Sequence, residues 1–459
     1  MLTTVEELSA RRKTIILVTC CLSLLISSMD ATIVNVAIPT IRDDLGASMS
    51  RLQWIVDIYT LTLASLLMLS GAAADRFGRR RVFRIGLLTF AVGSLLCSLA
   101  PSIEVLIGAR FLQAIGGSML NPVAMSIITT VFTGRVERAR AVGVWGAVVG
   151  ISTAMGPLVG GLLIDSLGWQ SVFWINLPIV AVALVLTTVY VPESKSATPR
   201  GMDPIGQVLA IAVMFTLVFG LIEKKPVVFV VTAAALAGFV WHESRHKSPF
   251  IDLRFFRSFP FSSATVIAVC SFAALGAFLF DMSLYLQGTR HFSAVHTGLL
   301  YLPMALGMLV FSPLSGRLVG RTGTRPSLLI AGTLMAVAGI GLTRLQPDTA
   351  IWQLVITFAV FGIGFGMVNA PITTTAVSGM PLDRAGAASA VASTSRQVGV
   401  SLGVALCGAL SGAGLWWTIS AFAIAVVGLG VAANTDWAYR TRDRVAPLLE
   451  QKAVPAHAG

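Results

Sequence analysis

The chain has 459 residues, of which 55% are hydrophobic and only 12% are charged, and its mean hydropathy is +0.83. Because an ordinary soluble domain carries roughly 25% charged residues, this composition excludes a soluble protein and places the chain in a lipid bilayer. The formal net charge of +12 would suggest nucleic-acid binding in a soluble protein. Here the basic residues lie in short loops beside apolar runs, which favours a role in membrane topology and in contact with anionic lipid. We therefore expect no nucleic-acid partner.

Long apolar runs predict fourteen membrane-spanning helices. A span needs about 20 apolar residues, because only a helix satisfies its own backbone hydrogen bonds in hydrocarbon at that length. The two runs between residues 205 and 241 are short and are joined by charged residues, so they could instead form a re-entrant hairpin. The predicted spans are 14–38, 52–74, 82–100, 102–131, 138–163, 169–191, 205–222, 226–241, 260–285, 297–317, 325–344, 351–378, 384–409 and 414–433.

The order of the spans indicates two halves of six helices with an insert between them. We expect an N-terminal six-helix bundle at 1–191, a linker with the two short spans at 192–259, a C-terminal six-helix bundle at 260–433 and a cytoplasmic tail at 434–459. A basic loop, GAAADRFGRRR at 71–81, has a weaker copy in the second half, GRLVGRTGTR at 316–325. A parallel duplication of this kind puts a substrate cavity near the membrane midplane, between the halves.

The distribution of Lys and Arg predicts that both termini are cytoplasmic. With that orientation 25 of the 33 basic residues lie inside, six lie outside and two lie within spans, as expected from the excess of basic residues in cytoplasmic loops. The first span is longer than the roughly 7–15-residue apolar core of a signal peptide, so we expect it to be retained.

Neither the cysteines nor any nucleotide motif indicates a cofactor. All five cysteines fall within predicted spans without CxxC spacing, so neither a disulfide framework nor a zinc site is indicated. The sequence contains no Gly-Lys pair, which excludes a P-loop of its own as an ATP site. We therefore expect no bound metal and no cofactor.

Four short motifs occur in the first half. They are MDATIVNVAIP at 29–39, the basic loop at 71–81, RFLQAIG at 110–116 and GPLVGG at 156–161. Together with WINLP at 174–178 and SPFIDLRFF at 248–256, they make the chain resemble the major facilitator superfamily and, within it, the drug:proton antiporter family with fourteen transmembrane helices. The resemblance covers nearly the whole chain. It implies an all-α membrane protein with the major facilitator fold, in which two extra central helices join two six-helix bundles.

Five ionisable side chains fall inside predicted spans and are functional candidates, because each is costly there unless it faces water or a partner. At a rise of 1.5 Å per residue, Asp30 of the first span and Arg110 of the fourth both lie about 12 Å from the outer surface and could pair. Asp57 could recognise a cation, form a second proton site or be a polar residue with water access near the outer mouth. We expect the shallower Asp281 to be a polar residue with water access near the outer mouth. Arg396 could contact a substrate group or hydrogen-bond backbone carbonyls.

An Asp30–Arg110 pair could act as a proton switch. A carboxylate in a poorly solvated cavity can take up and release a proton when a conformational change moves its cationic partner or admits water, while the guanidinium stays charged. The alternative is a fixed ion pair that only tethers two helices. The switch requires that the Asp30 carboxyl group reach an aqueous vestibule.

In the basic loop, Gly71 and Gly78 allow a close helix approach and a tight turn, and Asp75 could accept hydrogen bonds from the N-terminus of an opposing helix. The resemblance implies that this cluster locks the cytoplasmic side while the cavity faces outward, a role that falls on Asp75, Arg76 and Arg79. The loop could also be a positively charged topology anchor, and both roles are compatible. The basic members that could pair with acids on neighbouring helix ends are Arg76, Arg79 and Arg80.

The fifth span contains Gly156, Pro157, Gly160 and Gly161. These residues remove one amide donor and most side-chain bulk, so the helix can bend and pack closely against a helix of the second half. The resemblance links this motif to antiport. The further polar candidates for a cavity wall are Asn35, Gln113, Asn121 and Asn369, with Arg396 and Asp281.

From the resemblance we expect a secondary active transporter rather than an enzyme, namely a proton-coupled antiporter that exports small amphipathic or cationic drugs by alternating access. Its partners would be the substrate, protons and the lipid bilayer, with the proton gradient as energy source. We expect a monomer in the inner membrane of a bacterial cell. Two alternatives stay open, an exporter dedicated to one metabolite or antibiotic and a membrane sensor that does not transport.

Overall fold

The computed structural model describes residues 8–196, 203–246, 250–378, 380, 385–410 and 412–450. These residues are helical or lie in short connections, and they contain no β-strand. The chain divides into two compact units, Met1–Met202 with Leu279–Leu302 and Asp203–Phe278 with Pro303–Gly459. The expected division into two bundles, a linker and a tail stays a prediction.

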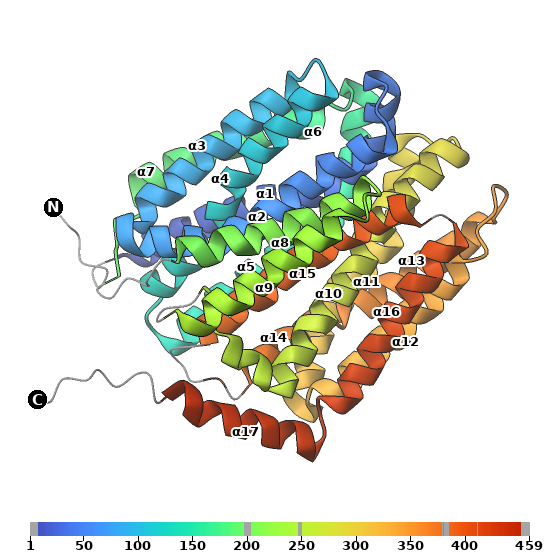
Figure 1. Cartoon of the computed structure of the whole chain (residues 1–459). Coiled ribbons are helices and arrows are strands. Elements are labelled where there is room, and N and C mark those ends of the chain that lie inside the picture. The colour runs from blue at the N-terminus through green and yellow to red at the C-terminus, as the bar shows by residue number, and fades with distance from the viewer. Residues whose placement is uncertain are drawn as a thin grey trace, which may run out of the picture. The chain divides into compact units, whose positions relative to one another are not determined.

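Seven helices make up most of the first unit. They are α1 Ala10–Leu45, α2 Met49–Phe77, α3 Arg79–Ser98, α4 Ile103–Val131, α5 Arg135–Leu167, α6 Ser171–Trp174 and α7 Asn176–Tyr190. α1 packs against α5, α4 packs against both α2 and α3, and α7 packs against α1 and α3 (Figure 1). This arrangement brings α1, α3, α4 and α7 around one buried centre.

Side-chain caps and a glycine turn set the ends of these helices. The Ser48 hydroxyl accepts a hydrogen bond from the Arg51 amide at the start of α2, and Ser102 does the same for Val105 at the start of α4. Each cap satisfies one of the amides that a helix N-terminus leaves without a partner. Between α2 and α3 the chain turns at Gly78, whose φ of +111° is readily adopted only by glycine.

α5 is bent in its middle. Its two parts, Val136–Thr153 and Met155–Leu167, meet at an angle of 42°. Pro157 has no amide to donate to the Thr153 carbonyl, and its ring crowds that carbonyl. The bend therefore falls one turn before the proline, where proline kinks occur.

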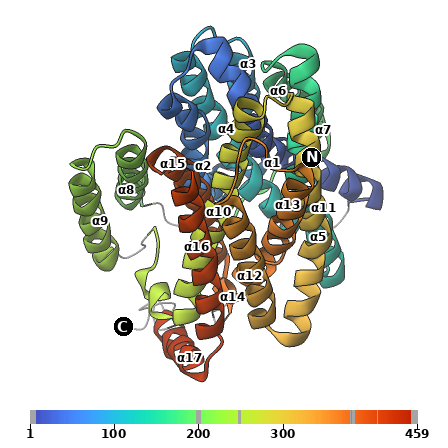
Figure 2. The same cartoon turned by 90° about the vertical axis from the view of Figure 1, so that its right-hand side faces the viewer.

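The second unit holds most of the remaining helices, and α10 and α11 run through both units. α8 packs against α9 and α15, α12 packs against α13, α14 and α16, and α17 packs against η2. Figures 1 and 2 both show α8 and α9 side by side. The elements are α8 Pro204–Ile222, α9 Val228–Arg245, η2 Leu253–Arg257, α10 Phe259–Leu284, η3 Tyr285–Thr289, α11 Ala294–Thr322, α12 Thr324–Leu342, α13 Ile351–Gly366, α14 Asn369–Val377, α15 Ala385–Ala409, α16 Ala413–Ala432 and α17 Asp436–Glu450.

Eleven helical stretches among the described residues are long and apolar enough to cross a membrane, or twelve if the two parts of α5 count as one span. All fourteen predicted ranges contain helix, but α9 and α15 are not among these twelve. The reason lies in their sequences, because α9 ends in His242, Glu243 and Arg245 and α15 is rich in Ala, Ser and Gly. An all-α multispanning protein is thus confirmed, whereas the number fourteen stays a prediction.

The C-terminal tail contains a helix, α17, that the sequence analysis did not predict. The Trp437 ring lies 4.9 Å from the Phe259 ring, and the Phe259 amide donates to the Thr441 hydroxyl at 3.0 Å. These contacts hold the first turns of α17 against the start of α10.

Candidate functional site

A buried polar network lies at the centre of the first unit, and we call it the Asp30 network. It consists of Asp30 from α1, Ser94 from α3, Arg110 and Gln113 from α4, and Asn176 from α7. Arg110 is 1% exposed and the other four side chains have no exposed surface. Residues far apart in the sequence therefore meet at one point inside the bundle.

Both oxygens of the Asp30 carboxylate accept hydrogen bonds. Arg110 Nη1 donates to Oδ2 at 2.5 Å, while Gln113 Nε2 and Asn176 Nδ2 donate to Oδ1 at 2.9 and 3.1 Å. Gln113 also donates to the Ser94 hydroxyl at 2.8 Å and accepts from Arg110 Nη1 at 2.7 Å. Such a network offsets the cost of burying a charge, because a buried polar group is expensive mainly when it lacks a partner.

The surroundings of Arg110 suit a permanently charged guanidinium. Its Nε donates to the Ile55 carbonyl at 3.2 Å, and its Cζ lies 4.0 Å from the centroid of the Tyr59 ring and 5.7 Å from that of Phe173. Aromatic faces attract a cation, and more strongly where water is excluded. Arg110 is thus held by α2 and by its own helix as well as by Asp30.

The Asp30 network is closed to solvent in this conformation. The sequence predicted that Asp30 and Arg110 could meet across an aqueous cavity. The structure brings them into direct contact but leaves Asp30 with no exposed surface, because the amides of Gln113 and Asn176 occupy the positions that water would take. Exchange of a proton at Asp30 therefore requires another conformation in which water reaches the carboxyl group.

The other charged candidates within spans lie in different surroundings. Asp57 on α2 is fully buried, which differs from the alternative of a residue with water access near the outer mouth. Asp281 on α10 is half-buried. Arg396 on α15 is also half-buried, and its Nη2 donates at 2.6 Å to the hydroxyl of Thr373 on α14, while its Cζ lies 5.9 Å from the Phe272 ring.

Of the four uncharged candidates, Gln113 alone belongs to the Asp30 network among the described hydrogen bonds. Asn35 is buried, and its side-chain amide donates to the carbonyls of Ala31 and Thr32 on its own helix. Asn121 accepts a hydrogen bond from Ser27 at 3.1 Å, which links α4 to α1. Asn369 begins α14 and is half-buried. In the present conformation these contacts give Asn35 and Asn121 each a structural role, within α1 and between α4 and α1 respectively.

The basic loop motif at 71–81 forms the last turns of α2, the turn at Gly78 and the start of α3, and it is held by contacts within the first unit. Arg79 donates to Asp75 Oδ1 at 3.0 Å and also to the hydroxyl of Thr130 on α4, so it links the end of α2 to α4. Arg80 donates to the Thr188 carbonyl at 2.9 Å. Arg76 is exposed, with its guanidinium 5.9 Å from the adjacent Phe77 ring.

The predicted pairing of arginines with acids on neighbouring helix ends is seen for Arg79 at the start of α3, whose partner Asp75 lies in the last turn of α2, and not for Arg76 or Arg80 among the described ion pairs. Among the described residues the ion pair of this loop is the one between Arg79 and Asp75, which lie one turn apart in sequence. Gly71 faces α4, where an added Cβ would lie 3.8 Å from the Pro122 side chain. That position allows ordinary contact and does not by itself require glycine.

The N-terminus of α3 is capped by Glu193, which the sequence analysis missed. Its Oε1 and Oε2 accept the amides of Arg80 and Arg81 at 3.1 and 3.2 Å. A carboxylate is favoured there because a helix N-terminus carries partial positive charge. Asp75 was predicted to fill this kind of role but is engaged by Arg79 instead. A Cβ added at Gly78 would lie 2.6 Å from Glu193 Oε1, so the glycine makes room for the cap.

The glycines of the fifth span pack α5 against α1 next to the Asp30 network. A Cβ added at Gly156 would lie 2.0 Å from Thr32 Oγ1, and one added at Gly160 would lie 2.7 Å from Ile33 Cγ1. Both contacts fall within three residues of Asp30 along α1. The missing side chains therefore allow α5 to support the segment that carries the buried carboxylate.

The same motif also contacts the start of α11. A Cβ added at Gly161 would lie 2.4 Å from the Ala294 carbonyl oxygen, and one added at Gly298 would lie 2.6 Å from that of Pro157. The sequence predicted close packing on a helix of the second half, and α11 begins in that half. The contact with α1, within the first half, was not predicted.

Three members of the site were absent from the sequence-based set, namely Ser94, Asn176 and Glu193. Asn176 lies in WINLP at 174–178, a motif that carried part of the family resemblance, so the signal was present. Glu193 lies two residues after the sixth predicted span and could have been recognised as an acid at the cytoplasmic end of a span, on the side where the basic loop was expected. Ser94 has no sequence signal, because a serine in a span usually bonds its own helix.

Many apolar helices around a buried ion pair define an α-helical integral membrane protein with a charged centre. Residues 20–404 match the Major Facilitator Superfamily, and the chain belongs to this family. The family consists of membrane transporters, so transport rather than catalysis is the activity class of this chain.

Named relatives agree with that assignment. The chain is 36% identical over 407 residues to the multidrug resistance protein Stp of Mycobacterium tuberculosis (strain CDC 1551 / Oshkosh), with 87% of this chain and 76% of that protein covered. It is 36% identical over 395 residues to the tetracenomycin C resistance and export protein of Streptomyces glaucescens, with 83% and 73% covered.

A solved structure agrees with the fold. It is a bacterial homologue of the human lysosomal transporter Spinster, with a TM-score of 0.61 and 19% identity, and the alignment covers 98% of this chain and 100% of that one. Membership of the major facilitator superfamily and a multi-pass membrane location are therefore confirmed.

Proposed function

We propose that this protein is a proton-coupled antiporter that exports small amphipathic or cationic compounds by alternating access. The buried Asp30–Arg110 pair carries the proposal, because a bundle that only anchors or senses has no evident reason to hold charges in its interior. The relatives named for multidrug resistance and for antibiotic export support outward transport of such compounds.

In this proposal Asp30 carries the proton and Arg110 is the fixed cation. A proton on Asp30 replaces an ion pair by a weaker hydrogen bond and so loosens the contact of α1 with α4. Arg110 keeps the Ile55 carbonyl, Gln113 and the Tyr59 ring as partners. It therefore stays in place while α1 is released, which lets water reach Asp30 from one side of the membrane at a time.

Two further motifs would couple this event to opening and closing. α5 contacts α1 through Gly156 and Gly160 beside Asp30, so a movement of α1 would be transmitted to the bent helix. We assign the cytoplasmic lock to Asp75, Arg76 and Arg79, of which Arg79 links α2 to α4. Asp57 would serve as a second proton site or as a contact for a cationic substrate.

The proposed setting follows the sequence-based expectations. We propose fourteen spans with both termini in the cytoplasm, in the inner membrane of a bacterial cell, because most basic residues then lie on the cytoplasmic side. The transporter would work as a monomer, with the proton gradient as its energy source and without a cofactor.

A second candidate function is export of a single metabolite or antibiotic. The observation that favours it is the similarity to a protein named for resistance to and export of one compound, tetracenomycin C. A resistance profile separates the two candidates. Cells that produce the protein should tolerate many chemically unrelated compounds if it is a multidrug exporter, and one compound or one scaffold if it is dedicated.

Everted membrane vesicles test the proposed function. A pH gradient is imposed by respiration and followed with a fluorescent weak base, and a lipophilic cation such as tetraphenylphosphonium is then added. Vesicles with the protein should lose part of the gradient, because each exported cation is exchanged for protons, whereas vesicles without it should not. If no compound of a chemically diverse panel causes proton movement, the protein is not a proton antiporter and the sensor alternative is favoured.

A further inference from the structure

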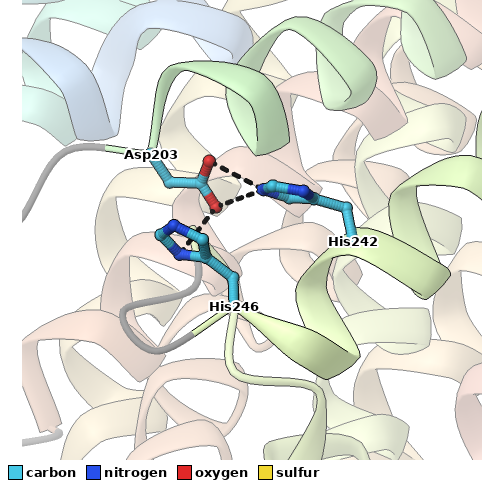
Figure 3. A group of neighbouring side chains, drawn as sticks. All are labelled: Asp203, His242 and His246. Atoms are coloured by element: carbon cyan, nitrogen blue, oxygen red, sulfur yellow. Dashed lines mark hydrogen bonds and ion pairs between the residues drawn. The ribbon is translucent and has the colours of Figure 1, made fainter.

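A second cluster of ionisable side chains lies in the second unit, where the start of α8 meets the end of α9. Asp203 is the residue that precedes α8, His242 lies in the last turn of α9, and His246 directly follows α9. Figure 3 shows both imidazole rings turned towards the Asp203 carboxylate. We call these three residues the α8–α9 cluster. It has no part in the proposed transport mechanism.

The helix pair explains why these residues meet. α8 and α9 run antiparallel, with a hydrogen bond between Thr216 and Thr232 towards the connecting turn. The residue that precedes α8 therefore lies beside the residues at the end of α9. His242 and His246 are four residues apart, a spacing that places two side chains on the same face of a helix end. One carboxylate and two imidazoles are thereby directed to one point.

The donor atoms are close enough to share one ion. His242 Nε2 lies 2.9 and 3.0 Å from the two Asp203 oxygens, and His246 Nδ1 lies 3.4 Å from Oδ2. One donor atom from each residue lies within 4.8 Å of the others. The rings are stacked, with centroids 5.1 Å apart and 24° between their planes.

We propose that the α8–α9 cluster binds a divalent transition metal of the Zn²⁺ type, with His242 Nε2, His246 Nδ1 and the Asp203 carboxylate as ligands. Four-coordinate Zn²⁺ holds nitrogen and oxygen ligands at about 2.0–2.2 Å, which places neighbouring ligand atoms of a tetrahedron roughly 3.3–3.6 Å apart. The separation of His246 Nδ1 from Asp203 Oδ2 falls in this range, whereas His242 Nε2 lies at hydrogen-bond distance from the carboxylate and would move slightly away from it when an ion binds. Imidazole ligands favour zinc, copper and nickel, whereas Ca²⁺ and Mg²⁺ prefer sets made of oxygen atoms.

An ordinary helix cap explains only part of this arrangement. Asp203 does cap α8, since its Oδ1 accepts the Gly206 amide at 2.8 Å, and a hydrogen bond to Asp203 accounts for His242. His246 Nδ1, however, is a buried atom that forms no hydrogen bond with the described residues. A metal ion would give this nitrogen a coordinate bond, where it now has a 3.4 Å contact with Asp203 Oδ2 that lacks hydrogen-bond geometry.

A neighbouring carboxylate gives a second, independent indication. Glu243 is 3% exposed, and its Oε2 accepts the Ile251 amide at 3.0 Å, whereas its Oε1 is buried and has no hydrogen-bond partner among the described residues. A Cβ added at Gly206 would lie 2.1 Å from Glu243 Oε1 and 2.7 Å from Asp203 Oδ2. Two buried carboxylates therefore converge beside Gly206, and a bound cation would offset their repulsion.

Metal binding by the purified full-length chain tests the proposal, after removal of any histidine tag. Zn²⁺ binding is measured by calorimetry, and Co²⁺ serves as a coloured probe of the coordination sphere. The wild-type chain should bind one ion that excess Mg²⁺ and Ca²⁺ do not displace. His242→Gln and His246→Gln should each weaken binding by about 100-fold or more, since even outer-shell partners contribute about 10–100-fold to metal affinity.

The control is His296→Gln, because His296 is exposed and lies outside the cluster. This variant should bind Zn²⁺ like the wild-type chain. Asp203→Asn should also lose the ion although asparagine still caps a helix, and size-exclusion profiles should show that each variant is folded. Zn²⁺ should raise the melting temperature of the wild-type chain and of His296→Gln only. Absence of binding to the wild-type chain, or unchanged binding after both cluster histidines are replaced, would overturn the proposal.

Discussion

The Asp30 network and the α8–α9 cluster both place a carboxylate between nitrogen donors, yet they differ in their access to water. Asp30 has no exposed surface, and its partners are a guanidinium and two amides, which do not change their protonation state at any physiological pH. In the α8–α9 cluster the side chains of His242 and His246 are 15% and 38% exposed. An ion from solution can therefore reach the cluster directly, whereas a proton reaches Asp30 only when helices move.

The comparison separates two uses of a buried carboxylate. Where every partner is fixed and water is excluded, the carboxylate can report on a conformational change, because its protonation and the opening of the bundle are linked. Where partners are imidazoles near a helix end, the same group is suited to holding a metal ion. The surroundings, rather than the residue type, decide between the two.

The largest expected effect is that of Arg110→Ala. Because this change leaves the Asp30 carboxylate buried without its cation, we expect the free energy of unfolding to fall by about 3–5 kcal/mol. It is measured by titrating the protein from a mild detergent into a denaturing one.

The matched control is Arg51→Ala. Arg51 pairs with Glu104 at 3.8 Å, and both side chains are at least half exposed, so the loss should be about 0–1 kcal/mol. Equal losses for the two variants would mean that water already reaches Asp30 in the resting protein, and the description of a closed network would be wrong.

Gly156→Ala should have the next largest effect. The added methyl group would collide with Thr32 two residues after Asp30, and overpacking of this kind costs about 1–3 kcal/mol. The control is Gly146→Ala, also on α5, where the added methyl group would have no neighbouring atom within 4 Å. Its stability should be unchanged or slightly higher. Unfolding titrations of both variants check this, and a stable Gly156→Ala protein with unchanged transport would show that α5 does not support the Asp30 segment.

The sequence was sufficient for features that depend on composition and spacing. Helix lies in every predicted range, for example Pro204–Ile222 where 205–222 was expected, because long apolar runs have few alternatives to helix in a bilayer. The sequence could not show towards which neighbouring helices the side chains point. Equal depth suggested that Asp30 and Arg110 could meet, but the closure of the site depends on the amides of Gln113 and Asn176, and no local pattern connects Asn176 to Asp30.

The α8–α9 cluster was missed for a related reason. Cysteine spacing gives no sign of it, because the ligand atoms come from two histidines and from an aspartate 39 residues before the first of them. Only the antiparallel return of α9 along α8 brings them together. Contacts that depend on tertiary packing could thus not be predicted from the sequence, even though the residues that form them could be read from it.

The smallest expected effect concerns Glu193, an exposed residue that caps α3. Glu193→Gln keeps an acceptor for one amide but loses the charge, so stability should fall by about 0.3–1 kcal/mol, and the loss should shrink at high salt. Glu193→Ala should cost more, since both amide partners are removed. Identical unfolding curves for the two variants and the wild-type chain would show that the cap does not contribute.

The central claim is that Asp30 carries the proton of the transport cycle, and one comparison tests it most directly. Asp30→Asn and Asp43→Asn are reconstituted in proteoliposomes, and transport of a lipophilic cation driven by an imposed pH gradient is measured. Asp43 lies on the same helix but is exposed, so it controls for the chemical change. Asp30→Asn should remain folded and lose the driven transport, whereas Asp43→Asn should retain it. Driven transport at the wild-type rate in Asp30→Asn would contradict the account.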